Sequence, residues 1–502
     1  MFREPVCATA FEINPVRRLR TAVSISGLLG YGMSIVGCVA LLLWPALLNG
    51  YPLVFADTGT YLSQAIQHYI GWDRPAIYSV FLLLMHWKLT TWVVIVVQAG
   101  FTVYVLSAVR RAFAPDVSRR MLLPMIALLC VVTPLPWFVG QLMPDLFTSL
   151  LALVIAILVL APQSFSRLEM AGLAVFASWM IAVHLSNVWI SIGLVCTLIP
   201  ARRLLGVGHR LGLQGLRRVV APILVAMLVL CTINLAAFGR FSISPFGNVF
   251  LLARLVYDGS ATATMETDCT TTNWRLCRYL SVLPPHQTTF PTSDDFLWRS
   301  DGPLARLGGA KRLSQESGQI IVRTIEEHPI AVMESSLGNL EKQLLCFRSG
   351  DGLNAWMEQV GPVIGRSFPA AEVRKFRTSR QSRGLVLLPQ WLSRLHGIVF
   401  FAGLILTVVC LVIEIRRRKP LALLCAAILL CMMGNAAATG MLSGPHDRYQ
   451  NRIIWLAMII PILGGCRVWT RASRQLPLRR HDFQDVAEAE GQDYVHPVLE
   501  AV

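Results

Sequence analysis

Ionisable side chains stand beside several long apolar runs of this sequence. These ionisable residues are Asp57, Asp73, Arg74, Asp145, His184, His446, Asp447 and Arg448. A carboxylate or an imidazole can move a proton, and a guanidinium can bind a phosphate through two parallel hydrogen bonds. Ionisable groups near a membrane are costly unless they are used. If the apolar runs span a membrane so that these residues share one boundary, the sequence predicts a site there.

The composition indicates a membrane protein. Of the 502 residues, 54% are hydrophobic and only 15% are charged, whereas a soluble protein has roughly a quarter charged residues. The mean hydropathy is +0.56. Apolar runs of about 20 residues, which is the length that crosses a bilayer, recur along the chain.

The runs predict an all-α polytopic membrane protein with about ten transmembrane helices. The expected spans are Ser24–Leu48, Trp92–Val109, Met121–Phe138, Leu146–Leu160, Ala171–Val183, Val188–Ile199, Val219–Phe238, Leu395–Ile415, Leu421–Met441 and Ile453–Cys466. This divides the chain into an N-terminal membrane domain (1–238), a soluble periplasmic domain (239–391), C-terminal membrane helices (392–467) and a disordered cytoplasmic tail (468–502).

Arginine clusters between the spans indicate the orientation. With the amino terminus in the cytoplasm, the clusters around Arg17, Arg110, Arg202, Arg416 and Arg471 all fall on the cytoplasmic side, as the positive-inside rule requires. Both termini are then cytoplasmic, and we expect a multi-pass protein of the bacterial inner membrane. The net charge of +16 is spread over these clusters, and no nucleic-acid-binding motif accompanies it, so nucleic acid is not an expected partner.

Two segments on the other side are longer than turns. The first, 49–91, holds apolar residues at helical spacing from Tyr61 to Ile70, which predicts an amphipathic helix in the membrane interface with Asp57 as its N-cap. A second short helix is expected from Pro75, capped by Asp73. The other segment, 239–391, is expected to be mainly helical and soluble.

The twelve cysteines lie mostly in apolar runs. Cys269 and Cys277 lie in the polar segment, where a disulfide between them is possible if that segment is periplasmic. No cysteine and histidine spacing typical of zinc sites is present.

The first loop and two later motifs resemble the GT-C glycosyltransferases, which include the lipid A aminoarabinose transferases and protein O-mannosyltransferases. The motifs are Ala56-Asp57-Thr58-Gly59-Thr60-Tyr61, Asp73-Arg74-Pro75-Ala76-Ile77-Tyr78, Met143-Pro144-Asp145 and Ser443-Gly444-Pro445-His446-Asp447-Arg448-Tyr449. The resemblance covers the membrane portion only. Many GT-C enzymes have paired acidic residues in the first loop, whereas this chain has one Asp followed by Thr, so a divalent cation stays an open question.

The resemblance implies an inverting glycosyltransferase that moves a sugar from a polyprenyl-phosphate carrier to a glycan, lipid or protein acceptor outside the cell membrane. Asp57 is then the catalytic base, and Arg448 and Arg74 bind the phosphate. The expected substrate-binding residues are Tyr61, Asp73, Tyr78, Asp145, His184, His446 and Tyr449.

Structural alternatives stay open for these residues. The acidic ones can be helix caps, His184 can be a polar group at a tight turn, and the arginines can be interfacial anchors. Two other functions also stay open. One is a transporter or flippase for a lipid-linked or anionic substrate, and the other is a non-catalytic envelope assembly protein.

Overall fold

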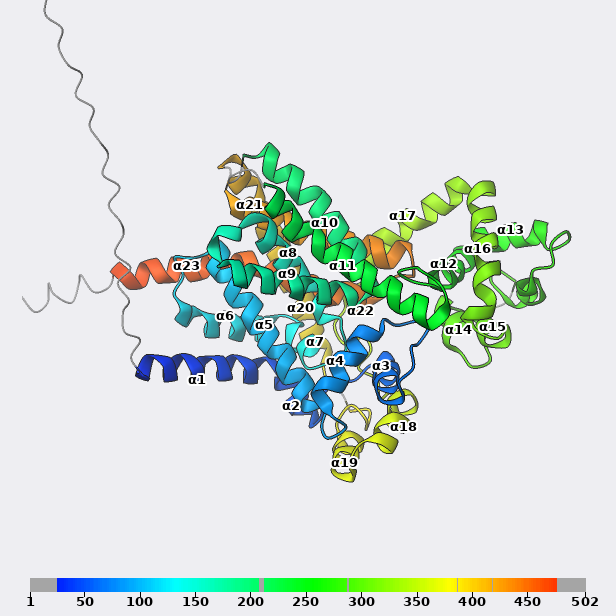
Figure 1. Ribbon diagram of the computed structural model, residues 1–502, viewed down its shortest axis with the longest axis horizontal. Helices are drawn as coiled ribbons and strands as arrows, with labels where there is room; N and C mark the ends of the chain where they lie inside the picture. The colour runs from blue at the N-terminus through cyan, green and yellow to red at the C-terminus, as the bar shows by residue number, and fades with distance from the viewer. Residues whose placement is uncertain (1–24, 207–211, 287–288, 386, 418, 476–502) are drawn as a thin grey trace, which may run out of the picture.

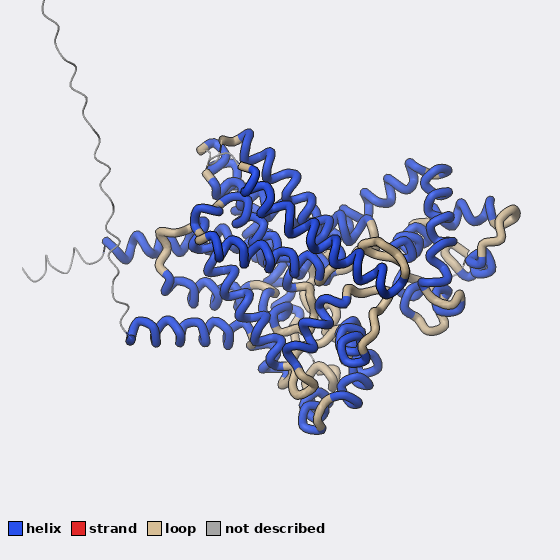
Figure 2. Tube along the Cα trace, viewed as in Figure 1, coloured by secondary structure: helices blue, strands red, loops and turns tan. Residues whose placement is uncertain are grey.

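The computed structural model describes residues 25–206, 212–286, 289–385, 387–417 and 419–475 (Figure 1). These residues form helices and loops without a β-strand (Figure 2). Leu53 and Gln141 form an isolated β-bridge, which joins the loop after α2 to the loop after α7.

The apolar runs form a bundle of roughly aligned helices. Its helices are α1 (Ile25–Leu42), α2 (Trp44–Asn49), α5 (Trp92–Phe113), α6 (Leu122–Val132), α7 (Leu135–Val139), α8 (Leu146–Leu160), α9 (Arg167–Ala182), α10 (Leu185–Leu204), α11 (Leu213–Phe238), α20 (Gln390–Arg416), α21 (Pro420–Ala436), α22 (Asp447–Ile454) and α23 (Ile459–Gln475). Short turns of other helix types are η1 (Arg119–Met121), η2 (Pro162–Ser164), the π-helical η4 (Ala437–Met441) and η5 (Trp455–Met458).

Within the part of the chain that the structure describes, six helices are long and apolar enough to cross a membrane, so the chain is a multi-pass membrane protein by the length and composition of its helices. They are Trp92–Phe113, Leu185–Leu204, Leu213–Phe238, Gln390–Arg416, Pro420–Met441 and Asp447–Ser473. The other expected spans form α1 with α2, α6 with α7, α8 and α9, which are helices but shorter or interrupted. The amino-terminal end of α1 and the carboxyl-terminal end of α23 both lie at the left of Figure 1.

Helix α8 is the centre of the bundle. All of its residues from Leu146 to Leu160 are buried, and α5, α9, α10, α11 and α21 pack around it. A helix that is apolar all round is stable only where no face meets water. In contrast α20 exposes large apolar side chains such as Ile398, Ile405 and Val412, which is typical of a lipid-facing helix.

The first long loop forms two short helices, α3 (Ala56–Gln67) and α4 (Ala76–His86), that pack against each other. Both helix starts differ from the expectation. Phe55 is the N-cap of α3, with Asp57 already in its first turn, and Pro75 is the N-cap of α4. Helix α3 begins at Ala56, one residue before Asp57, and α4 begins at Ala76, directly after Pro75. Asp57 and Asp73 are therefore not helix caps.

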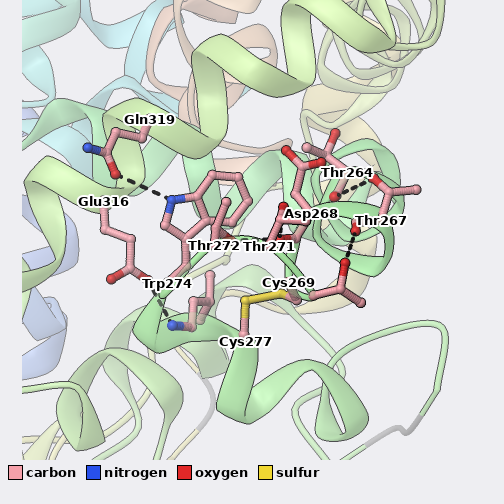
Figure 3. Close-up of a disulfide and its surroundings, with 12 residues drawn as sticks. Thr264, Thr267, Asp268, Cys269, Thr271, Thr272, Trp274, Cys277, Glu316 and Gln319 are labelled. Carbon is pink, nitrogen blue, oxygen red and sulfur yellow. Dashed lines mark hydrogen bonds between the residues drawn. A yellow bond between two sulfur atoms is a disulfide. The ribbon is translucent and has the colours of Figure 1, made fainter.

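The segment after α11, for which the sequence predicts a mainly helical soluble domain over 239–391, is helical and has two parts. Residues 246–327 form a distal lobe with a hydrophobic core of its own, at the right of Figure 1. Its elements are α12 (Gly247–Tyr257), α13 (Ser260–Asp268), η3 (Arg275–Val282), α14 (Ser293–Trp298), α15 (Pro303–Arg306) and α16 (Ala310–Glu327). Cys269 and Cys277 form a disulfide in this lobe (Figure 3).

The rest of this segment returns to the bundle. Helix α17 (Pro329–Leu345) packs against η4 and α21. Helices α18 (Met357–Ser367) and α19 (Ala370–Thr378) lie beside α3, below the bundle in Figure 1. Gly59 permits this contact, since a Cβ there would overlap the carbonyl oxygen of Gln359.

The carboxyl end also differs in part. The expected disordered tail began at residue 468, but α23 continues as a helix to Gln475. Residues 476–502 and the arginine cluster around Arg17 lie outside the described residues.

Candidate functional site

A continuous series of charged and polar contacts lies where α8, α10 and α22 begin. It joins side chains from the first loop, from the starts of α8 and α10, and from α22, and we call it the ion-pair chain. Its members, in order of contact, are Arg74, Asp57, Arg448, Asp145, Arg452 and His184. The structure thus brings together five residues that the sequence singled out, and adds Arg452.

Arg452 occupies the buried end of the ion-pair chain. Its side chain is 0% exposed, and its three nitrogens donate to four side chains. The acceptors are Asp145 Oδ1 at 3.2 Å, His184 Nε2 at 3.0 Å, Ser186 Oγ at 3.0 Å and Asn435 Oδ1 at 2.6 and 3.3 Å. A guanidinium has five N–H donors, so these contacts occupy all of them. Arg452 therefore has a positioning role.

These contacts fix the state of the neighbouring groups. Arg452 can only donate, so His184 Nε2 accepts from it. His184 Nδ1 lies 2.9 Å from Ser186 Oγ and 3.4 Å from the backbone N of Ser186. Burial lowers the pKa of His184 well below its usual value, and the charge of Arg452 lowers it further. Burial would raise the pKa of Asp145, but Arg448 and Arg452 outweigh it and lower that pKa to about 2. Asp145 is thus ionised and His184 neutral at neutral pH.

Arg448 is held differently, by charges and an aromatic ring. Its guanidinium carbon lies 3.7 Å from the centre of the Phe55 ring. Its distances to Asp57 Oδ2 (3.6 Å) and Asp145 Oδ1 (3.7 Å) are those of ion pairs and exceed hydrogen-bond lengths. Its buried Nη1 has no hydrogen-bond partner among the described residues. Arg448 therefore has donor capacity left for a ligand.

The start of α22 is held by the segment that follows α17. Asp351 accepts a hydrogen bond from the backbone N–H of Arg448 at 3.0 Å. Gln343 exchanges two hydrogen bonds with the backbone of His446, and Asp447 accepts from the N–H of Arg348. The carboxylate of Asp447 is thus engaged with the backbone of the segment after α17.

The accessible end of the ion-pair chain is formed by Asp57 and Arg74, whose side chains are 15% and 20% exposed. Arg74 Nη2 donates to Asp57 Oδ1 at 2.8 Å, and Arg74 Nη1 donates to the carbonyl of Asp73 at 3.1 Å. The Asp73 carbonyl, rather than its carboxylate, makes this contact. Asp57 lies between two guanidinium groups, those of Arg74 and Arg448.

The remaining predicted residues lie around this centre or apart from it. Tyr449 lies 5.5 Å from the guanidinium of Arg448, and His446 lies 3.6 Å from Asp294 of the distal lobe. Tyr61 and Tyr78 are fully buried and pack edge to face. Tyr78 donates to Gln98 at 2.8 Å and packs among core aromatic rings.

Sequence reasoning missed Arg452 and Phe55. The available signal for Arg452 was its spacing: Arg448 and Arg452 are four residues apart and so share one helix face. The expected span begins at Ile453, directly after Arg452. Phe55 precedes Asp57 and carried no signal of its own.

Within the described ranges, no three His, Cys, Asp or Glu side chains are grouped so that they could hold a metal ion. Asp57 forms ion pairs with two arginines, Arg74 and Arg448. No protein-family model, curated protein or solved structure matches this chain.

Proposed function

We propose that the chain is a membrane glycosyltransferase that moves a sugar from a polyprenyl-phosphate carrier to an acceptor. The observation that carries the proposal is the contrast between the two arginines of α22. Arg452 uses all of its donors inside the protein, whereas Arg448 keeps a buried nitrogen without a partner at the same site. An unsatisfied buried donor costs about 1–3 kcal/mol, which a bound anion would recover.

The charge of the ion-pair chain fits such a donor. Three guanidinium groups face two carboxylates, because His184 is neutral, and one positive charge is left in excess. A polyprenyl-phosphate sugar is a phosphodiester with one negative charge. Its phosphate would bind Arg448, with Phe55 holding the guanidinium plane from the other side.

The reaction requires a base and an anion-binding group. The acceptor oxygen forms a bond to the anomeric carbon while the bond from that carbon to the phosphate oxygen breaks. The electron pair of the broken bond leaves with polyprenyl phosphate, whose growing charge Arg448 stabilises. The acceptor proton passes to Asp57, the carboxylate at the accessible end. Arg74 keeps Asp57 in place.

A transporter of an anionic or lipid-linked substrate is the second candidate. One observation favours it: α21 ends in the π-helical turn η4, close to the Asn435 contact of Arg452. Such turns occur often at functional sites and interrupt a helix in the way that transporter helices are interrupted.

The test is genetic rescue with a chemical readout. Envelope glycans and lipids of a strain lacking the gene are profiled by mass spectrometry, and rescue is attempted with Asp57→Asn, Arg448→Ala and the control Arg467→Ala. Arg467 is also an arginine paired with an aspartate, but it lies in the middle of α23 and pairs with Asp116, outside the ion-pair chain. We expect a sugar-bearing species to disappear, and only the wild type and Arg467→Ala to restore it.

Two other outcomes are informative. If both site variants restore the species at matched expression, the transferase proposal is wrong. If instead the lost species is found unmodified on the cytoplasmic leaflet of the membrane, the function is transport and the π-helical turn becomes the part to study.

A further inference from the structure

Two tryptophans from distant parts of the chain stack beside the accessible end of the ion-pair chain. Trp72 follows α3, and Trp298 ends α14 of the distal lobe. Their ring centres are 5.7 Å apart and their planes differ by 27°. Phe250 of α12 packs against both rings at 5.5 and 5.8 Å. Trp298 is nevertheless 44% exposed, so part of a large aromatic surface, fixed in place by two other rings, is open.

This aromatic surface is connected to Asp57 through one side chain. The guanidinium carbon of Arg74 lies 5.4 Å from the centre of the Trp298 ring, and Arg74 donates to Asp57 at 2.8 Å. A molecule that lies on the exposed part of Trp298 is therefore separated by one side chain, Arg74, from the carboxylate that we assign as the base.

Hydrogen-bonding groups flank the same surface. Asp294 stands four residues before Trp298 on α14, so both are on one side of that helix. Its carboxylate lies 3.6 Å from His446 Nε2. The side chains of His446 and Asp294 are 36% and 49% exposed. An acid and an imidazole at this distance can both accept and donate hydrogen bonds.

We propose that Trp72, Trp298 and Asp294 form a binding site for a pyranose ring of a saccharide acceptor. A pyranose has one face of C–H groups, which packs on an indole, and a rim of hydroxyl groups, which a carboxylate and an imidazole bind. Concave sites that combine apolar faces with a few polar groups are typical of small-molecule recognition. A lipid chain would leave Asp294 and His446 unused. Assigning the saccharide as acceptor rests on the proposed function, because the assignment requires Asp57 to be the base.

The test measures saccharide binding without any donor. The full chain in lipid nanodiscs is titrated with disaccharides of the hexose and N-acetylhexosamine types, and binding is followed by saturation-transfer NMR. We expect at least one of them to bind. Trp298→Ala should weaken that binding roughly tenfold, which corresponds to the upper range for an aromatic contact. Trp298→Phe should keep part of it, and Asp294→Asn should weaken it as well.

Trp391→Ala is the matched control, because Trp391 is also exposed but lies at the start of α20. It should bind as the wild type does. The proposal is wrong if no disaccharide binds the wild type, or if Trp298→Ala binds as well as Trp391→Ala does.

The two proposals fail separately. If Asp57→Asn restores the envelope species while Trp298→Ala still loses saccharide binding, the transferase proposal fails and the saccharide site stands. If Asp57→Asn loses the species while Trp298→Ala keeps both the species and saccharide binding, only the saccharide site fails.

Discussion

Replacing Arg452 with methionine tests whether the buried end of the ion-pair chain is a positioning device. The change removes the cation that contacts Asp145 at 3.2 Å and leaves that carboxylate, which is 1% exposed, with Arg448 alone at 3.7 Å. Breaking a buried ion pair by removing one partner costs about 3–5 kcal/mol. The acceptors on His184, Ser186 and Asn435 lose donors as well, so we expect a value at the upper end of this range.

The control is Arg467→Met, which breaks an ion pair between Arg467 and Asp116 that is partly exposed and should cost about 1 kcal/mol or less. The assay is equilibrium unfolding of the purified chain by sodium dodecyl sulfate in mixed micelles, followed by tryptophan fluorescence. The double variant Asp145→Asn/Arg452→Met should be more stable than the sum of the single losses by about 1–3 kcal/mol, because it leaves no unpaired charge. If Arg452→Met costs no more than Arg467→Met, the positioning role is refuted.

Three further predictions concern stability. Burial lowers the pKa of His86 to about 4 from an unfolded value near 6.5. The contribution of His86 to the free energy of unfolding is therefore complete above pH 6.5 and is lost as the pH falls toward 4. The melting temperature should fall between pH 7.5 and 5, and it should fall less in His86→Gln. Replacing Cys269 and Cys277 with serine should destabilise the distal lobe by about 2–3 kcal/mol, given the short loop that the disulfide closes, and peptide mapping without reductant should find the linked pair in the wild type. Gly59→Ala should cost about 1–3 kcal/mol through overpacking, whereas Gly100→Ala, with open space around its Cβ, should not lower the melting temperature.

The parts of the fold that could be predicted are those specified by local sequence. Each apolar run is helical, since burial of an apolar segment leaves its backbone only intrahelical hydrogen bonds. Asp145 stands at the start of α8, as expected, whereas α10 begins directly after His184, three residues before the expected span.

What could not be predicted depends on contacts between distant segments. The packing of α18 on α3 joins residues about 300 positions apart, and no local pattern announces it. The same is true of Arg452, whose importance arises from acceptors on three other helices or loops. The aromatic contact between Trp298 and Trp72 likewise depends on where the distal lobe packs.

The ion-pair chain has a consequence for the order in which the protein is made. Asp145 and Arg452 are 307 residues apart in the sequence. At roughly 5–20 residues per second, a ribosome delivers the arginine about 15–60 s after the aspartate. During that interval Asp145 stands at the start of an apolar helix without its main counter-charge. The site is therefore complete only once α22 has been synthesised, and a chain truncated before α22 should be recognised by membrane quality control as unfinished.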